Sequence, residues 1–108
     1  MSVQTQAVLA ALLQEPANER YGLEIAREAG LPGGTIYPIL ARLEGAGWLE
    51  SFWEQIDPSA AGRRPRRYYR LTGPGEREGS KVLRETIERL SPAARRAPSV
   101  GTPKVVTS

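Results

Sequence analysis

Five arginines cluster within eight positions in the middle of the chain: Arg63, Arg64, Arg66, Arg67 and Arg70. No acidic residue lies between Asp57 and Glu76 to neutralise them within the segment. The guanidinium group is a planar fork that can pair with two phosphate oxygens at once. The cluster therefore predicts a contact with nucleic acid, although a solvated loop without a partner can have the same composition. The structural elements predicted on either side of the cluster distinguish between these two interpretations.

The composition excludes many kinds of enzyme. The 108 residues include no His and no Cys, together with 15 Lys+Arg and 12 Asp+Glu, for a net charge of +3. Without thiolate or imidazole there is no disulfide, no zinc site built on those ligands and no Cys nucleophile. The commonest general base is also missing. No pair of acids stands out by its spacing, and no phosphate loop or metal motif appears. We therefore expect no enzymatic activity, no metal and no cofactor.

The apolar segments are too short for a membrane protein. The longest strongly apolar run, Ala7 to Leu13, falls well below the roughly 20 residues that span a bilayer. The first residues lack the basic stretch of a signal peptide. We expect a cytoplasmic protein that associates with the nucleoid and not with a membrane.

Apolar spacing and capping residues divide the chain into helices and strands. Helices are expected at 3–14, 20–29, 33–46 and 73–90, strands at 48–54 and 67–71, and a loop at 55–65. Ser2 or Thr5 can cap the first helix, Gly30 ends the second, and Thr72 can cap the last. The final segment, 91–108, contains three prolines and no periodicity, and is predicted to be disordered.

The order of these elements is that of a helix-turn-helix followed by a wing. Ala26 lets the second and third helices cross closely, and Gly30, four positions later, makes the turn between them. The two strands form a hairpin tipped by the arginines. We therefore predict a mainly α fold with a two-stranded β wing, divided into a winged helix-turn-helix domain at 1–72, a dimerisation helix at 73–90 and a disordered tail at 91–108.

Two motifs in these elements resemble a known family. They are the run GTIYPILARLE from Gly34 to Glu44, with Tyr21-Gly22 before it and Gly47-Trp48-Leu49 after it, and the run RRYYRLT from Arg66 to Thr72. Over about residues 7–90 the chain resembles the PadR-like transcriptional regulators. The resemblance implies a winged-helix, dimeric, bacterial DNA-binding repressor whose C-terminal helices pair with the partner subunit. The short C-terminal region is similar to that of the family's small subgroup, which has a single C-terminal helix.

The third helix has one apolar and one open face. Ile36, Ile39, Leu40 and Leu43 form a stripe that faces inward. On the opposite side, Pro38, Ala41 and Gly45 are compact enough to press close to a groove, while Tyr37 and Arg42 can reach into it. Arginine is the commonest reader of guanine, and tyrosine and backbone N–H groups usually contact phosphate. The glycines that begin the helix would let backbone amides approach a phosphate.

We therefore expect helix 33–46 to enter the major groove and the wing, 62–67, to contact phosphates or the minor groove. The predicted DNA contacts are Gly33, Gly34, Thr35, Tyr37, Pro38, Ala41, Arg42, Arg63, Arg64, Arg66 and Arg67. Alternatives remain for several of them. Tyr37 can be a packed residue, Arg42 can form an ion pair with Glu44 or another acid, and Arg67 or Arg70 can pair with Glu50 or Glu54 across the hairpin.

A dimer is expected from the first and last helices. The first helix is apolar on all sides, so it needs cover from more than one direction, and the last helix has an apolar seam too thin to fold alone. The predicted dimer contacts are Val8, Leu12, Val82, Leu83, Ile87 and Leu90. The alternative for the first helix is a central core position in a monomer. Trp48 and Trp53 either pack beneath the wing or form a surface that stacks on a ligand.

These features together predict a dimeric, sequence-specific DNA-binding regulator, a repressor that binds an inverted-repeat operator in double-stranded DNA. The sequence does not identify a small-molecule inducer. The alternative function is a winged-helix protein-interaction module whose arginines bind an acidic partner.

Overall fold

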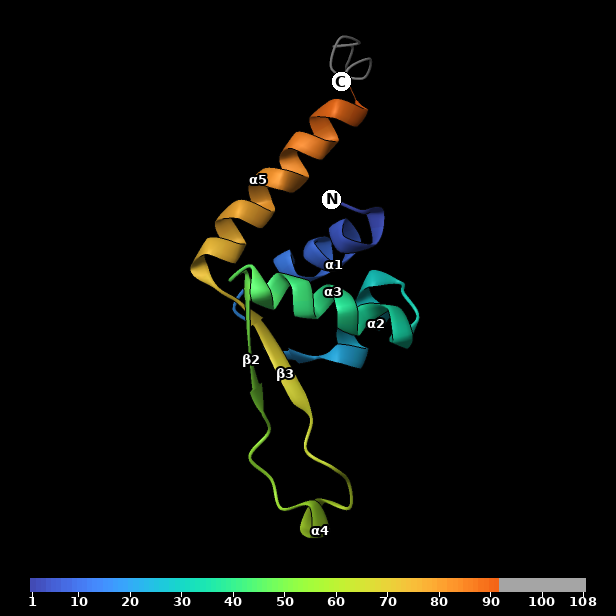
Figure 1. Cartoon of the computed structure of the whole chain (residues 1–108), viewed down its shortest axis with the longest axis vertical. Coiled ribbons are helices and arrows are strands. Elements are labelled where there is room, and N and C mark those ends of the chain that lie inside the picture. The colour runs from blue at the N-terminus through green and yellow to red at the C-terminus, as the bar shows by residue number, and fades with distance from the viewer. Residues whose placement is uncertain (92–108) are drawn as a thin grey trace, which may run out of the picture.

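The computed structural model describes residues 1–91 (Figure 1). Its elements are, in order, α1 Val3–Leu13, β1 Arg20–Tyr21, α2 Gly22–Ala29, α3 Gly33–Gly45, β2 Leu49–Trp53, α4 Pro58–Ala61, β3 Arg67–Leu71 and α5 Gly73–Leu90. The predicted tail at 91–108 lies, apart from Ser91, outside the described residues. The domain borders proposed at residues 72 and 73 coincide with the cap and the first residue of α5.

The first helix is the centre of a single-chain core. Ser2 caps α1 as predicted, since its Oγ accepts a hydrogen bond from the N–H of Thr5 at 3.1 Å. The helix packs against both α2 and α5, which explains why it is apolar on all sides. Val8 and Leu12, which we expected at a dimer interface, are fully buried within one chain. Their burial therefore needs no second subunit.

The second and third helices form the expected helix-turn-helix. Gly30 ends α2 in the left-handed region, with φ 71°, and the N–H of Leu31 then bonds to the carbonyl of Ala26 at 2.8 Å. A residue with a Cβ adopts this conformation only at a cost, so glycine is the natural choice for the turn. The start of α2 differs from the prediction, because Arg20 and Tyr21 form a strand and the helix begins at Gly22.

The sheet has three strands where we predicted two. The order is β1–β3–β2, with antiparallel pairing throughout. In β1, Arg20 lies opposite Tyr69 and Tyr21 opposite Tyr68. Leu49, Tyr69 and Leu71 are buried against the helices, so one face of the sheet completes the core. The resulting architecture is a winged helix-turn-helix, with β2 and β3 forming the wing.

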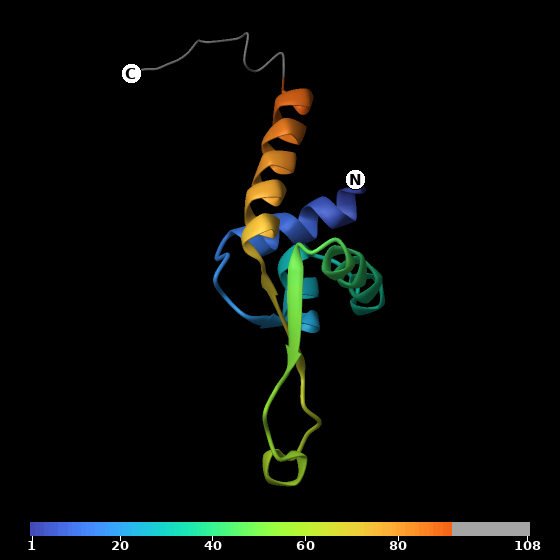
Figure 2. The ribbon, with the colours of Figure 1, turned by 60° about the vertical axis from the view of Figure 1, so that its left-hand side comes forward.

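The wing extends away from the helices and carries α4 at its tip (Figure 2). We predicted a loop at 55–65, and this short helix lies within it. Asp57 caps the helix by accepting the N–H of Ser59 at 3.0 Å, and Gly62 ends it with φ 70°. Trp48 packs against the core as expected. Trp53 does not: it is 55% exposed on the wing, so the interpretation of core packing is wrong for this residue.

The last helix begins on the body of the protein and then leaves it. Thr72 caps α5 as predicted, through a 3.0 Å hydrogen bond from the N–H of Gly75 to its Oγ1. The first turns contact α1 and β3, and Leu83 packs against the core. The C-terminal part of α5 projects away from the body, opposite to the wing (Figure 1). Ile87 and Leu90 are 63% and 78% exposed there.

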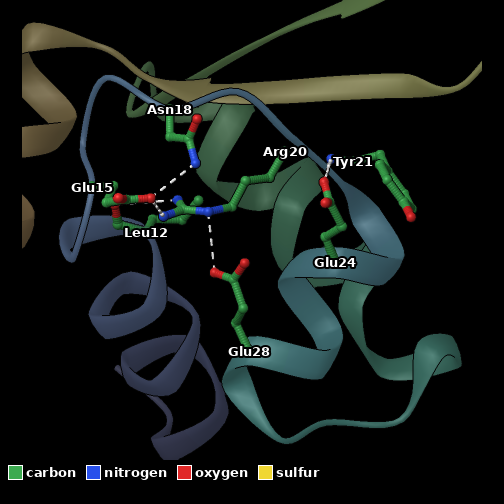
Figure 3. A network of polar contacts seen from close by, with 7 residues as sticks. All are labelled: Leu12, Glu15, Asn18, Arg20, Tyr21, Glu24 and Glu28. Atoms are coloured by element: carbon green, nitrogen blue, oxygen red, sulfur yellow. Dashed lines mark hydrogen bonds and ion pairs between the residues drawn. The ribbon is translucent and has the colours of Figure 1, made fainter.

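A buried arginine, which the sequence analysis did not single out, connects three of these elements (Figure 3). Arg20 is only 4% exposed. Its guanidinium group donates a hydrogen bond to the carbonyl of Leu12 at 3.4 Å and forms ion pairs with Glu28 at 3.1 Å and Glu15 at 3.9 Å. The contacts satisfy a charge that would be costly to bury alone. They hold β1 against the end of α1 and the side of α2.

Candidate nucleic-acid interface

The open face of α3 is as the helical spacing predicted. Ile36, Ile39, Leu40 and Leu43 are buried, whereas the side chains we predicted to face DNA are exposed: Tyr37, Pro38, Ala41 and Arg42. In the first turn Gly34 is exposed, and Gly33 and Thr35 are half-buried. Pro38 lies within the helix. Because proline has no N–H, the carbonyl of Gly34 lacks its helical donor.

The position of Tyr37 depends on a glycine in another helix. The ring of Tyr37 is 48% exposed and its inner edge lies against Gly22, the first residue of α2. A Cβ at position 22 would lie 2.6 Å from Cε1 and 2.9 Å from the hydroxyl oxygen of Tyr37. Both distances are far below van der Waals contact. The Tyr21-Gly22 pair of the sequence motif therefore has a physical explanation, since only glycine at position 22 leaves room for this ring.

Arg42 has no ion pair or hydrogen bond with any side chain among residues 1–91, and it is exposed. The partner considered from the sequence, Glu44, is occupied elsewhere: it accepts a hydrogen bond from Ser51 and forms an ion pair with Arg67. The guanidinium of Arg42 is therefore available to a ligand that approaches the open face of α3.

Besides Arg67, two more of the clustered arginines pair with acids from outside the cluster. Arg63 forms a bidentate pair with Glu54, with Nη1–Oε1 at 2.6 Å and Nη2–Oε2 at 2.9 Å. Arg70 pairs with Glu19 at 2.8 Å and with Glu50 at 3.2 Å. The pairing of Arg70 with Glu50 was one of the alternatives seen in the sequence. The pairing of Arg63 with Glu54 was not among those alternatives, since we expected Arg63 to contact phosphate.

Arg64 and Arg66 keep their guanidinium groups open. Arg64 is exposed and forms no ion pair within the described part of the chain. Arg66 lies over the ring of Tyr21, with 4.3 Å between Cζ and the ring centroid. This cation–π contact orients the side chain and leaves its N–H groups without a hydrogen-bond partner among residues 1–91.

Arg64 and Arg66 line a cleft between the helix-turn-helix and the wing. The cleft has a volume of about 880 Å³, and none of its lining residues is acidic. The residues that matter most for its chemistry are two aromatic side chains and four arginines: Tyr37, Trp53, Arg27, Arg64, Arg66 and Arg67. Arg27 comes from α2 and was missed in the sequence, because nothing in its local pattern shows that the fold brings it opposite the wing. The cleft is a positively charged groove with aromatic walls.

The bidentate pair in the wing shifts the titration of its acid. The hydrogen bonds from Arg63, with a further one from the N–H of Arg66, lower the pKa of Glu54 from its ordinary 4.5 to about 2, although burial opposes the shift. A lowered pKa in the folded state stabilises the wing above pH 4.5, and this contribution is lost as the pH falls towards 2.

We expect Arg63→Ala to return the pKa of Glu54 towards 4.5, because the main group that stabilises the carboxylate is removed. Carboxyl-carbon NMR titration of Glu54 measures this directly. Arg64→Ala is the matched control and should leave the midpoint near 2. An unchanged midpoint in Arg63→Ala would show that the pair does not form in solution.

Among residues 1–91 there is no cluster of three or more side chains suited to hold a metal ion. The same residues contain no helix with the length and apolar character required to cross a membrane.

Comparison with known proteins identifies the family. Residues 8–81 match the sequence profile of the Transcriptional regulator PadR-like family. The chain belongs to this family. No curated protein matches the sequence closely enough to count as a relative. The PadR-like proteins are DNA-binding transcriptional regulators and not enzymes, in agreement with the composition.

Solved structures share the fold of this PadR-like chain. A PadR family transcriptional regulator from Eggerthella lenta is 24% identical, with a TM-score of 0.66 over 90% of this chain and 87% of that one. A PadR family regulator from Clostridium difficile is 23% identical, with a TM-score of 0.65 over 85% and 97% of the two chains. The homodimeric winged helix-turn-helix DNA-binding domain of Mb0332 from Mycobacterium bovis, a possible ArsR-family regulator, is 26% identical, with a TM-score of 0.58 over 82% and 71%.

Proposed function

We propose that this PadR-like protein is a homodimeric repressor in the cytoplasm that binds an inverted-repeat operator in double-stranded DNA. The observation that carries the proposal is that Arg42, on the open face of α3, has no partner among residues 1–91. Beside α3, the described residues form a cleft lined by four arginines and no acid. An exposed helix face with one free arginine fits base reading, and the adjoining cleft fits the phosphate backbone.

In the proposed complex α3 enters the major groove. Arg42 reads a base edge, and Pro38 and Ala41 allow the helix to approach closely. Thr35 and the amides of Gly33 and Gly34 lie at the helix start, where a phosphate is favoured. Tyr37 lines the adjoining cleft, and its hydroxyl supplies a further phosphate contact there.

The cleft then receives the sugar–phosphate backbone beside the groove. Arg64 and Arg66 approach it from the wing and Arg27 from α2. Arg63 supports the wing through Glu54 and contacts the backbone less directly. Each phosphate contact releases counterions, so binding should weaken with salt by a slope of about −0.9 per contact.

A two-fold dimer would present two copies of α3 to the DNA, which is why we propose an operator with inverted-repeat symmetry. Two observations support the dimer. Ile87 and Leu90 leave an apolar seam uncovered at the end of α5, and the structurally similar Mb0332 domain is homodimeric. Repression follows where such an operator overlaps a promoter.

Arg42→Ala tests the reading role. Duplexes selected by the wild-type protein from a random-sequence library serve as the operator. The variant should lose about 1–3 kcal/mol of binding free energy on a selected duplex and little on a scrambled duplex, because only a base contact distinguishes the two sequences. Binding titrations on both duplexes at several salt concentrations measure the two losses.

The double variant Arg64→Ala with Arg66→Ala is the matched comparison. It should weaken binding to both duplexes by similar factors. It should also make the salt slope less steep by the amount expected for the loss of up to about two phosphate contacts. If Arg42→Ala loses affinity equally on both duplexes, α3 does not read sequence through this residue. If the wild-type protein selects no duplex, the regulator proposal fails and an acidic protein partner becomes the better candidate.

A further inference from the structure

A hydrogen-bonded group of three side chains joins α3 to the wing. Glu44 lies near the end of α3, Ser51 in the middle of β2 and Arg67 at the start of β3. Ser51 donates a hydrogen bond from Oγ to Oε2 of Glu44 at 2.5 Å. The same Oγ accepts hydrogen bonds from Nε of Arg67 at 3.0 Å and from Nη2 at 2.8 Å. Nη2 of Arg67 also lies 3.6 Å from Oε2 of Glu44.

The hydroxyl of Ser51 is the centre of this group. A serine hydroxyl has one donor and two acceptor sites, and here the donor is used by the carboxylate and the acceptors by the guanidinium. The strand alternation places Ser51 on the same face of β2 as the buried Leu49, which directs it towards α3. Within residues 1–91, the contacts of Glu44 are the only side-chain hydrogen bond and ion pair from α3 to the β2–β3 hairpin.

We propose that Arg67 and Glu44 are positioning residues, which act through Ser51 to fix the angle between α3 and the wing. The inference rests on the proposed DNA-binding function, but it gives Arg67 a different role from the phosphate contact expected from the sequence. Its guanidinium is already held by two groups of the protein and lies 5.5 Å over the ring of Trp53. An arginine held in this way fixes geometry, whereas Arg64 and Arg66 have open N–H groups.

In the proposed complex, α3 and the wing have to contact the DNA at the same time. If α3 lies in the major groove while the wing lies on the neighbouring backbone, the angle between them decides whether both sets of contacts form at once. Loss of the three-residue group lets the wing vary in angle, which weakens binding to the preferred duplex more than to a random one. The number of phosphate contacts, and with it the salt slope, stays nearly the same.

Ser51→Ala tests the proposal without changing any charge. We expect its affinity for a wild-type-selected duplex to fall by about 2- to 30-fold relative to a scrambled duplex, with an unchanged salt slope. If Arg67 were instead a phosphate contact, Ser51→Ala would free its guanidinium, and affinity would stay the same or rise. Ser51→Thr keeps the hydroxyl and should restore binding. Ser59→Ala, an exposed serine at the wing tip, is the matched control.

A measurement on the free protein separates this proposal from the proposed function. The chain has no cysteine, so spin labels on Ala46→Cys and Ala60→Cys report the distance between the end of α3 and the wing tip. We expect Ser51→Ala to broaden this distance distribution and Ser51→Thr to keep it narrow. An unchanged distribution in Ser51→Ala overturns the positioning role even where DNA binding is normal. A wild-type protein that selects no duplex overturns the DNA-binding function and leaves this measurement to decide the positioning role.

Discussion

Gly75→Ala is expected to destabilise the fold by about 3 kcal/mol, the upper part of the range for overpacked positions. A Cβ at position 75 would lie 2.0 Å from the carbonyl oxygen of Trp48 and 2.8 Å from its carbonyl carbon. These are backbone atoms, and the same oxygen accepts the N–H of Thr72 at 3.0 Å. The first turn of α5 and the start of β2 therefore have to separate to admit a single methyl group.

Denaturant unfolding at one fixed protein concentration measures this loss, because the stability of the proposed dimer would depend on concentration. Gly73→Ala is the matched control in the same turn. A Cβ there meets only the flexible end of Arg77, at 3.4 Å, and alanine favours a helix over glycine. Gly73→Ala should therefore keep or slightly raise the stability. Equal unfolding midpoints for the two variants would falsify the close packing of α5 on β2.

The combination of Ile87→Glu and Leu90→Glu is expected to give a folded monomer that binds a selected duplex at least about 100-fold more weakly. The two positions are exposed on the projecting part of α5, so the single chain tolerates the change. A two-fold interface would bring the new charges together in an apolar setting, which disfavours association. A monomer loses the gain in affinity that comes from binding two half-sites at once.

Sedimentation equilibrium measures the first effect and duplex titration the second. Lys81→Glu, which adds a negative charge on the opposite side of α5, should remain dimeric. A dimer that persists in the double variant places the interface elsewhere. Leu83, although part of the predicted seam, is unsuited to this test because it packs against the core, and a charge there would unfold the chain as well.

The periodic parts of the fold could be predicted from the sequence, and the reason is physical. Four apolar residues of α3 recur with helical spacing, so both its buried stripe and its exposed face could be predicted. Gly30 occupies a left-handed position that favours glycine, and Thr72 has a side chain that can cap the helix after it. Strand β1 could not be predicted in this way, since its two residues are too few to show alternation and it exists only through pairing with β3.

The candidate site was predicted less completely, because ion pairs between residues far apart in the sequence cannot be recognised from the sequence pattern. The arginine cluster contains no acid, yet Arg63 and Arg67 are held by Glu54 and Glu44, which come from outside the cluster. Arg27 also lines the cleft, although its helix, α2, is separated from the wing in the sequence. Nothing in the sequence around Arg20 indicated that its side chain is buried. Residue type indicated the chemistry of the candidate site, and three-dimensional contacts showed which arginines have no ion pair among residues 1–91.

The contact between Gly22 and Tyr37 also affects how this regulator can change. A larger residue at position 22 would turn the tyrosine ring outward on α3, since the side chain can rotate whereas the two backbones cannot separate. Substitutions at the two positions are therefore coupled, and a new side chain at one is tolerated when the other shrinks. A substitution in α2 is therefore expected to alter the proposed operator preference without replacing any of the proposed DNA contacts.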